Sequence, residues 1–157
     1  MNGDLWVIDA SVLAQLYVRD EEEHYTDIAD DIVRRSINDT LRLVAPQLIL
    51  YEVPSAIHRA VRRKRLAEHD ARLAIRHFFN LRLRTLGTEE SLPDLIQSAY
   101  ARATHLNCHL YDALYLVAAE VLDIPFITAD RKLYRQVRDE LDYVVWIADF
   151  ASHIGDR

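Results

Sequence analysis

The chain has 157 residues, and 50% of them are hydrophobic, which is enough for one buried core and short for two, so we predict a single domain over residues 1–157. Three glycines exclude a glycine-rich phosphate loop, one cysteine excludes an internal disulfide, and the lack of a signal or spanning segment predicts a cytoplasmic protein without membrane contact. A net charge of −6 gives no general attraction for a phosphate backbone.

Strand and helix patterns alternate from the N-terminus onward. Residues 5–8 form an apolar run typical of a strand, and apolar side chains then recur at helical spacing over residues 12–17. The next predicted elements are a helix over residues 26–37, a strand over 41–44 and a helix from Pro46 to about residue 63. Proline favours the first turn of a helix, so Pro46 should open that helix, whereas Pro54 should kink it.

The second half of the chain continues the alternation. Its predicted elements are helices over residues 67–79, 92–106, 111–122 and 131–139 and strands over 83–86, 125–128 and 143–147. The side chains expected in the core are Leu73, Ile75, Phe78 and Phe79 of the first helix and Trp6, Phe126 and Trp146 of the strands. Apolar strands separated by helices predict an α/β fold, a three-layer α/β/α sandwich with a mostly parallel central sheet.

Two acidic residues directly follow predicted strands. Asp9 comes after residues 5–8, and Asp130 comes after residues 125–128. Ligands of open α/β sheets bind beyond the carboxyl ends of the strands, so the two carboxylates converge if these strands are neighbours. Glu52 shares a helix face with Leu48, Ser55 and Arg59, and Asp112 opens an apolar helix.

Each acid also has an ordinary explanation. Aspartate is a common N-cap, and the alternative interpretation of Glu52 is a solvated helix residue. Capping does not account for acids set among core residues, however, and several carboxylates at one rim repel each other and need a cation. Oxygen ligands favour Mg²⁺ or Mn²⁺, which can activate water for attack on a phosphodiester. Zinc is a weaker interpretation, since His105, Cys108 and His109 have no evident fourth ligand.

Basic residues form a separate block. Residues 59–84 carry nine basic side chains against two acidic ones, a local balance of +7, which leaves −13 for the rest of the chain. A solvated helix face explains such a run equally well. The candidate RNA contacts are Arg59, Arg62, Arg63, Lys64 and Arg65. Three tyrosines are candidates for an interface, with burial as the alternative, and these are Tyr100, Tyr111 and Tyr115.

Four segments resemble the motifs of the PIN domains, and most closely the short stand-alone VapC-type toxins. They are VIDAS at residues 7–11, PQLILYE at 46–52, YDALYLVAAE at 111–120 and ITAD at 127–130. The third and fourth segments together are quite specific to that family. One position departs from it, since family members often carry asparagine three residues after the glutamate, where this chain has Ser55 preceded by Pro54.

The resemblance implies a function and a site. It implies a Mg²⁺- or Mn²⁺-dependent endoribonuclease that acts as the toxin of a toxin–antitoxin pair, forms a homodimer and is inhibited by an antitoxin protein. The implied catalytic and metal-binding residues are Asp9, Glu52, Asp112 and Asp130, with Ser11 and Thr128 as supporting hydroxyls.

Two alternatives stay open at this point. A PIN fold can serve as a non-catalytic RNA- or protein-binding module, although such a module has no need to bear the mutual repulsion of four acids. A haloacid-dehalogenase-like phosphatase also places an aspartate after its first strand, but it requires a second aspartate two residues later, where this chain has Ser11.

Overall fold

A five-stranded sheet forms the centre of the computed structural model, which describes residues 4–18 and 25–154. The strands are β1 (Asp4–Ile8), β2 (Leu41–Pro46), β3 (Leu83–Leu86), β4 (Phe126–Thr128) and β5 (Val144–Trp146). Their order is β3-β2-β1-β4-β5, and every neighbouring pair is parallel. The predicted α/β class and parallel sheet are confirmed.

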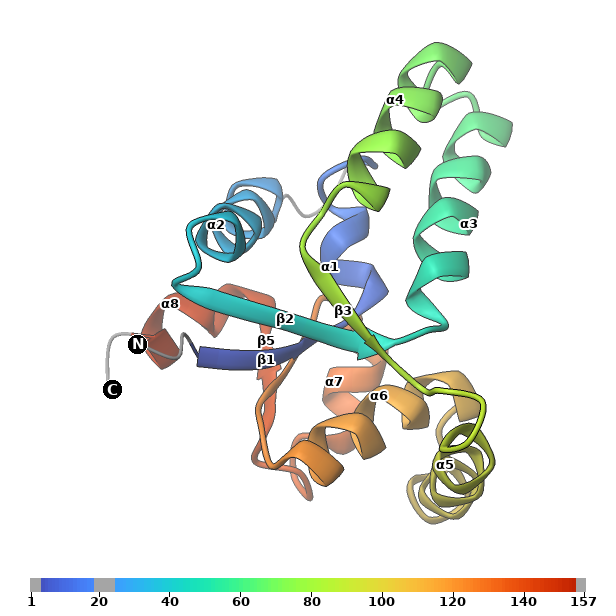
Figure 1. Ribbon diagram of the computed structural model, residues 1–157, viewed down its shortest axis with the longest axis vertical. Coiled ribbons are helices and arrows are strands. Elements are labelled where there is room, and N and C mark those ends of the chain that lie inside the picture. The colour runs from blue at the N-terminus through green and yellow to red at the C-terminus, as the bar shows by residue number, and fades with distance from the viewer. Residues whose placement is uncertain (1–3, 19–24, 155–157) are drawn as a thin grey trace.

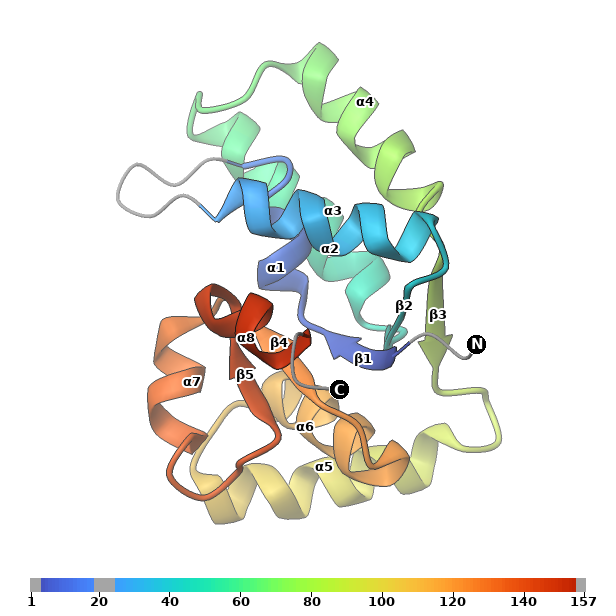
Figure 2. The same ribbon diagram turned by 90° about the vertical axis from the view of Figure 1, so that its left-hand side faces the viewer.

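Helices cover both faces of this sheet (Figure 1). One side carries α1 (Ala10–Ala14), α2 (Thr26–Ile37), α3 (Ile49–Arg62) and α4 (Glu68–Phe79), and the other carries α5 (Leu92–Leu106) and α6 (Leu110–Leu122). Two further helices are α7 (Arg131–Val137), which contacts β5, and α8 (Phe150–Ile154). The view turned by 90° shows the sheet between these helix layers, as the three-layer prediction requires (Figure 2).

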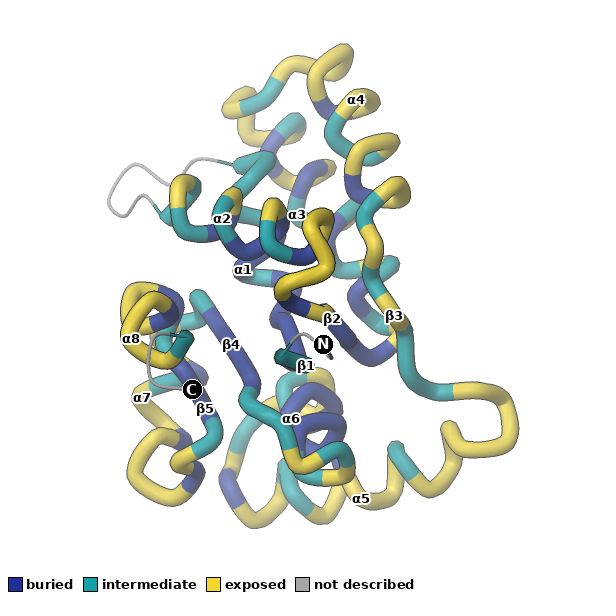
Figure 3. The backbone as a smooth tube through the Cα atoms, turned by 60° about the vertical axis from the view of Figure 1, so that its left-hand side comes forward, coloured by how far each residue is buried: buried dark blue, intermediate teal, exposed yellow. Residues whose placement is uncertain are grey.

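Burial explains why α6 lies at the centre. Seven consecutive residues of this helix, from Ala113 to Ala119, are buried because α5 packs on one side and strands β1 and β2 on another. Figure 3 shows the inner strands and α6 buried, whereas the outer surfaces of α4 and α5 are exposed. The apolar character of residues 111–122 had predicted this central position, and the prediction is confirmed.

The start of α3 differs from the prediction. Pro46 is the last residue of β2 rather than the first turn of a helix, and α3 begins three residues later at Ile49. The backbone N–H of Gln47 still donates to Leu86 at 3.0 Å, so the chain remains attached to β3 after the proline. Proline is tolerated at a strand end, where its missing N–H removes no ladder bond. The kink expected at Pro54 stays a prediction.

Two expected core residues are exposed. Leu73 is 49% exposed and Phe79 is 57% exposed, whereas Phe78 is buried. The helix α4 packs against α3 rather than on the sheet, so it has one narrow buried side. Trp6 and Phe126 are buried as predicted, and Trp146 on the edge strand β5 is half-buried.

No helix in residues 4–18 or 25–154 is long and apolar enough to cross a bilayer. The cytoplasmic location and the single domain over residues 1–157 stay predictions.

Candidate active site

The order of the strands brings Asp9 and Asp130 to the same edge of the sheet. Strand β1 pairs directly with β4, with Ile8 opposite Ile127, so both strands end at the same level. The backbone N–H of Asp9 donates to the carbonyl of Ile127 at 3.0 Å. The condition for Asp9 and Asp130 to converge, that their strands be neighbours, is met.

Two hydroxyl groups hold the buried carboxylate of Asp9. Ser11 Oγ donates to Asp9 Oδ2 at 2.6 Å, and Thr128 Oγ1 donates to the same oxygen at 2.7 Å. Asp9 is only 8% exposed, and Thr128 is fully buried. Hydrogen bonds to an ionised carboxylate are short and strong, so these two hydroxyls fix the direction in which Asp9 points.

The same hydroxyls also join the two turns that carry the acids. Ser11 Oγ accepts from the backbone N–H of Ala129 at 2.9 Å, and Thr128 Oγ1 accepts from that of Asp130 at 3.0 Å. A hydroxyl has one hydrogen and two lone pairs, so each of these side chains uses its hydrogen on Asp9 and a lone pair on the turn after β4. The turns after β1 and β4 are thereby locked together.

Glu52 is held from the opposite helix. The hydroxyl of Tyr115, on α6, donates to Glu52 Oε2 at 2.5 Å. Tyr115 is 1% exposed, and its ring stacks on Phe126 with 5.8 Å between the ring centroids. From the sequence, Tyr115 was open to two interpretations, an interface residue or a buried one, and the structure shows that the ring is buried. Its spacing of three from Asp112 places both side chains on one side of α6, but this spacing does not reveal the contact with Glu52 on α3.

The capping explanation holds for one of the three aspartates. Asp130 is the N-cap of α7, and its Oδ1 accepts from the N–H of Leu133 at 3.0 Å. Asp9 occupies the N-cap position of α1, but its side chain makes no capping hydrogen bond. Asp112 lies inside the first turn of α6, whose N-cap is His109. Capping therefore does not explain why an aspartate stands at position 9 or at position 112.

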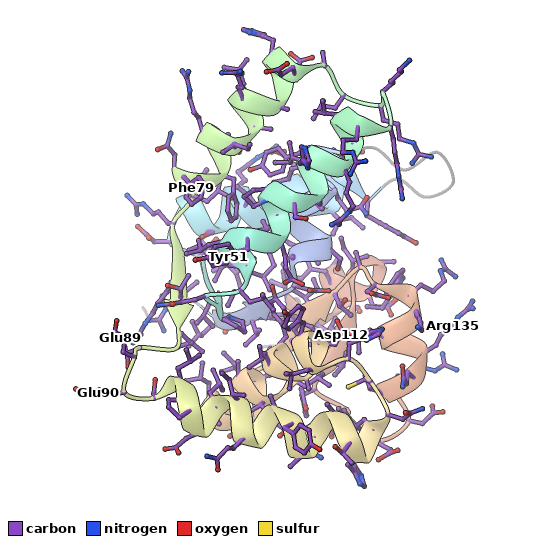
Figure 4. The ribbon with its side chains drawn as sticks, turned by 90° about the vertical axis from the view of Figure 1, so that its right-hand side faces the viewer. Tyr51, Phe79, Glu89, Glu90, Asp112 and Arg135 are labelled. Atoms are coloured by element: carbon purple, nitrogen blue, oxygen red, sulfur yellow. The ribbon has the colours of Figure 1, made fainter. Side chains whose placement is uncertain are left out.

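All four acids line one open cleft of about 680 Å³. Figure 4 shows its two sides, with Tyr51 on α3 and Asp112 on α6. The residues that line the cleft are Asp9, Ala10, Ser11, Ala14, Leu48, Tyr51, Glu52, Ser55, Ala56, Arg59, Tyr111, Asp112 and Asp130. Four separate segments of the chain thus contribute side chains to the cleft.

Burial and the charges of neighbouring acids raise the pKa values of three of these carboxyl groups, those of Asp9, Glu52 and Asp112. Burial raises the pKa of Glu52 to about 7, and the nearby Asp9 and Asp112 add to this, whereas the Tyr115 hydroxyl opposes it. Burial, followed by the charges of Asp9 and Asp130, raises the pKa of Asp112 to about 6. The pKa of Asp9 is also raised, mainly by burial. Full ionisation of the cleft is therefore unfavourable unless a cation compensates it.

The donor atoms suit a hard divalent ion. Every acidic side chain in the cleft offers oxygen, the ligand that Mg²⁺ and Mn²⁺ prefer. Across residues 4–18 and 25–154, no three His, Cys, Asp or Glu side chains already lie close enough together to hold a metal ion by themselves. The carboxylates instead surround an open space, which suits an ion that keeps part of its water shell, as Mg²⁺ usually does.

The basic residues divide into two groups. Arg59 lines the cleft, and its Nη1 donates to Ser55 Oγ at 3.0 Å. The other four candidates are exposed at the end of α3 and in the turn that follows, and these are Arg62, Arg63, Lys64 and Arg65. From Glu52 to Arg62 the helix advances about 15 Å. Arg59 is thus the basic candidate that the structure brings to the acids.

Known proteins match both the sequence and the fold. The family model of the PIN domain matches residues 6–139. The chain belongs to the PIN domain family. Among curated PIN relatives, Ribonuclease VapC12 of Mycobacterium tuberculosis is 30% identical over 128 residues, which cover 81% of this chain and 88% of that protein. Ribonuclease VapC3 of Pyrobaculum aerophilum is 28% identical over 127 residues, which cover 81% of this chain and 90% of that protein.

A third relative matches over a shorter length, and a solved structure matches over the whole chain. Ribonuclease VapC1 of M. tuberculosis is 33% identical over 98 residues, which span 57% of this PIN chain and 63% of that relative. The crystal structure of PAE2754 from P. aerophilum superposes with a TM-score of 0.65 at 17% identity and covers 99% of both chains. The predicted family is confirmed, and the solved structure supports the fold.

Proposed function

We propose that this protein is an endoribonuclease that hydrolyses RNA phosphodiester bonds with Mg²⁺ or Mn²⁺ held by Asp9, Glu52, Asp112 and Asp130. The observation that carries the proposal is that four carboxylates from separate elements line one cleft, where burial and nearby charge raise the pKa values of Asp9, Glu52 and Asp112. Such an arrangement costs stability, and it is explained if the cleft binds a divalent cation. The ribonuclease names of the PIN relatives support the same function.

Each side chain has a separate task in this proposal. A divalent ion bound there would activate water and offset the charge that develops on the phosphodiester. Asp9 is held in one orientation by Ser11 and Thr128, and Glu52 is held by Tyr115. The guanidinium of Arg59 lies at the same cleft and can bind an RNA phosphate, a role that Arg62, Arg63, Lys64 and Arg65 would extend along α3.

The biological role is part of the proposal. The relatives carry the name VapC, and we infer that this chain acts as the toxin of a toxin–antitoxin pair in the cytoplasm. Its partners would then be RNA, a cognate antitoxin protein and a second copy of the chain. The exposed apolar side chains on α4 and α5, including Phe79 and Tyr100, are available for contacts with such protein partners.

Cleavage of total cellular RNA tests the proposal. The purified protein, freed of any co-purified partner, is incubated with this RNA in Mg²⁺ or Mn²⁺, and parallel samples contain EDTA. Asp9→Asn and Asp112→Asn should abolish cleavage, whereas Glu90→Gln, which removes an exposed acid outside the cleft, should leave it unchanged. Discrete fragments that disappear in EDTA and in both variants support the nuclease. RNA that is bound and left intact under every divalent ion would favour a non-catalytic binding module.

A further inference from the structure

The eight tyrosines of the chain differ in whether their side chains have partners. Five of them contact another ring or donate to a side chain, namely Tyr17, Tyr25, Tyr115, Tyr134 and Tyr143. Among the described residues, Tyr51, Tyr100 and Tyr111 have no ring contact and no side-chain hydrogen bond, and they are 75%, 67% and 58% exposed. These three rings are therefore free to contact a ligand or another molecule.

Two of these three rings stand at the acidic cleft. Tyr51 and Tyr111 both line it, whereas Tyr100 lies elsewhere, on α5. Each of the two directly precedes an acid of the cleft, since Tyr51 is followed by Glu52 on α3 and Tyr111 by Asp112 on α6. Adjacent residues on a helix point about 100° apart, so each ring sits at the rim beside its acid. The two helices form opposite sides of the cleft (Figure 4).

An aromatic ring beside a phosphate site suits a nucleobase. Every base has a flat π-face, and stacking on Tyr, Phe or Trp is a general way to bind single-stranded RNA without reading its sequence. The cleft supplies what the rest of a nucleotide needs, namely acids for a cation at the phosphate and the guanidinium of Arg59. The cleft therefore carries two exposed rings next to charged side chains that suit a phosphate.

We propose that Tyr51 and Tyr111 are stacking platforms for two nucleobases of single-stranded RNA, one on each side of the phosphate held in the acidic cleft. The proposal rests on the proposed ribonuclease function and assigns to it two residues that contact bases. Bases in a duplex are stacked on each other and cannot offer their faces, so this cleft selects RNA that is unpaired at the cut.

Binding of two matched probes tests the stacking. The first probe is a fluorescein-labelled adenosine RNA octamer, and the second is an abasic ribose-phosphate octamer of equal charge. Both are titrated in Ca²⁺ in place of Mg²⁺, a hard cation that the same oxygen ligands bind, under conditions in which the wild type shows no cleavage. Tyr51→Leu and Tyr111→Leu should each weaken binding of the RNA octamer by about tenfold or more and leave binding of the abasic octamer unchanged. Tyr51→Phe should keep wild-type affinity because it keeps the ring.

Tyr100→Leu is the matched control, since it removes an equally exposed and unpartnered ring outside the cleft. It should bind both probes as the wild type does. Equal loss of affinity for both probes in Tyr51→Leu and Tyr111→Leu would overturn the proposal, because it would show that the rings do not act on bases. A lower mass of these variants in analytical ultracentrifugation without RNA would also overturn it and would assign the rings to an interface between two copies.

Wild-type cleavage of total RNA, measured in parallel, separates this proposal from the function on which it rests. If the wild type cleaves and the tyrosine variants bind the RNA octamer as tightly as it does, the stacking is wrong and the nuclease stands. If the wild type does not cleave but base-dependent binding is lost in the variants, the nuclease is wrong and the stacking stands.

Discussion

The hydroxyl of Tyr115 donates a hydrogen bond of 2.5 Å to Glu52 Oε2, so a buried residue of α6 holds an acid of α3. The two residues are 63 positions apart in the chain, and the bond joins the two helices that form the sides of the cleft. Glu52 therefore depends on a residue that is not itself one of the four acids.

Tyr115→Phe should weaken metal binding beyond what its loss of folding stability explains. The hydroxyl stabilises ionised Glu52, so its loss raises the pKa of Glu52 further above about 7 and leaves less carboxylate at neutral pH. Removal of a residue that supports a metal ligand typically costs about tenfold or more in metal affinity or activity. The Mn²⁺ concentration for half-maximal cleavage should rise accordingly at pH 7.

Tyr143→Phe is the matched control for this variant. It removes a tyrosine-to-glutamate hydrogen bond of 2.6 Å, to Glu120, away from the cleft. Both variants should lose similar stability, about 1–3 kcal/mol, but Tyr143→Phe should keep the wild-type Mn²⁺ dependence. An unchanged Mn²⁺ dependence in Tyr115→Phe would contradict the positioning role.

Ser11→Ala should lower the stability of the protein as well as its activity. This change removes a donor from Asp9 Oδ2 and leaves the N–H of Ala129 without its acceptor. The expected loss is about 1–3 kcal/mol in the free energy of unfolding, read from urea denaturation. Ser11→Thr, which keeps a hydroxyl, should recover part of it, and an unfolding midpoint of Ser11→Ala equal to that of wild type would contradict the role of the hydroxyl.

The stability of the metal-free protein should fall as the pH rises. The pKa of Glu52 is raised from its ordinary value of 4.5 to about 7, so the folded protein holds this proton more tightly than the unfolded chain does. The stabilisation is complete below pH 4.5 and is lost as the pH rises through about 7. In EDTA, the melting temperature should therefore decline by at least a few degrees between about pH 5 and pH 8.

Glu52→Gln isolates this contribution, because the amide oxygen can still accept from Tyr115 but does not titrate. The decline in melting temperature over the same pH interval should be smaller in the variant than in the wild type. Parallel curves for the two proteins would show that Glu52 titrates at its ordinary pKa in the folded state.

Arg59→Gln should reduce the dependence of RNA binding on salt. If Arg59 neutralises one phosphate of single-stranded RNA, its loss should lower the slope of log affinity against log salt concentration by about 0.7. Arg72→Gln serves as control, because Arg72 is exposed on α4, outside the cleft, and is paired with Glu68. Equal slopes for the Arg59→Gln variant and the wild type would remove Arg59 from the RNA contacts.

The fold class and the elements on which the four acids lie could be predicted from the sequence, because both follow from local patterns. Apolar strands, helical spacing and the acids at strand ends are visible without knowledge of tertiary contacts, and helices such as α2 and α5 begin and end as predicted. The order of the strands is not local, but the fold class implied that strands with terminal acids could be neighbours.

The sequence was insufficient where tertiary packing determines the burial or the partner of a residue. Phe79 is apolar but exposed, because α4 contacts α3 instead of the sheet. Pro46 ends a strand, because residue 47 still bonds to β3. Tyr115 is a partner of Glu52 only because α6 crosses the cleft opposite α3, and no spacing within one helix reveals a contact between two.

The hydrogen bond from Thr128 to Asp9 also determines when the protein can become active during its synthesis. The bond from Thr128 to Asp9 joins residues 119 positions apart, and β1 has no β4 to pair with until residue 128 has left the ribosome. A nascent chain that lacks this strand has Asp9 but neither Thr128 nor Asp130 beside it. The proposed nuclease therefore matures late in translation, and a chain that terminates before β4 should be inert toward RNA.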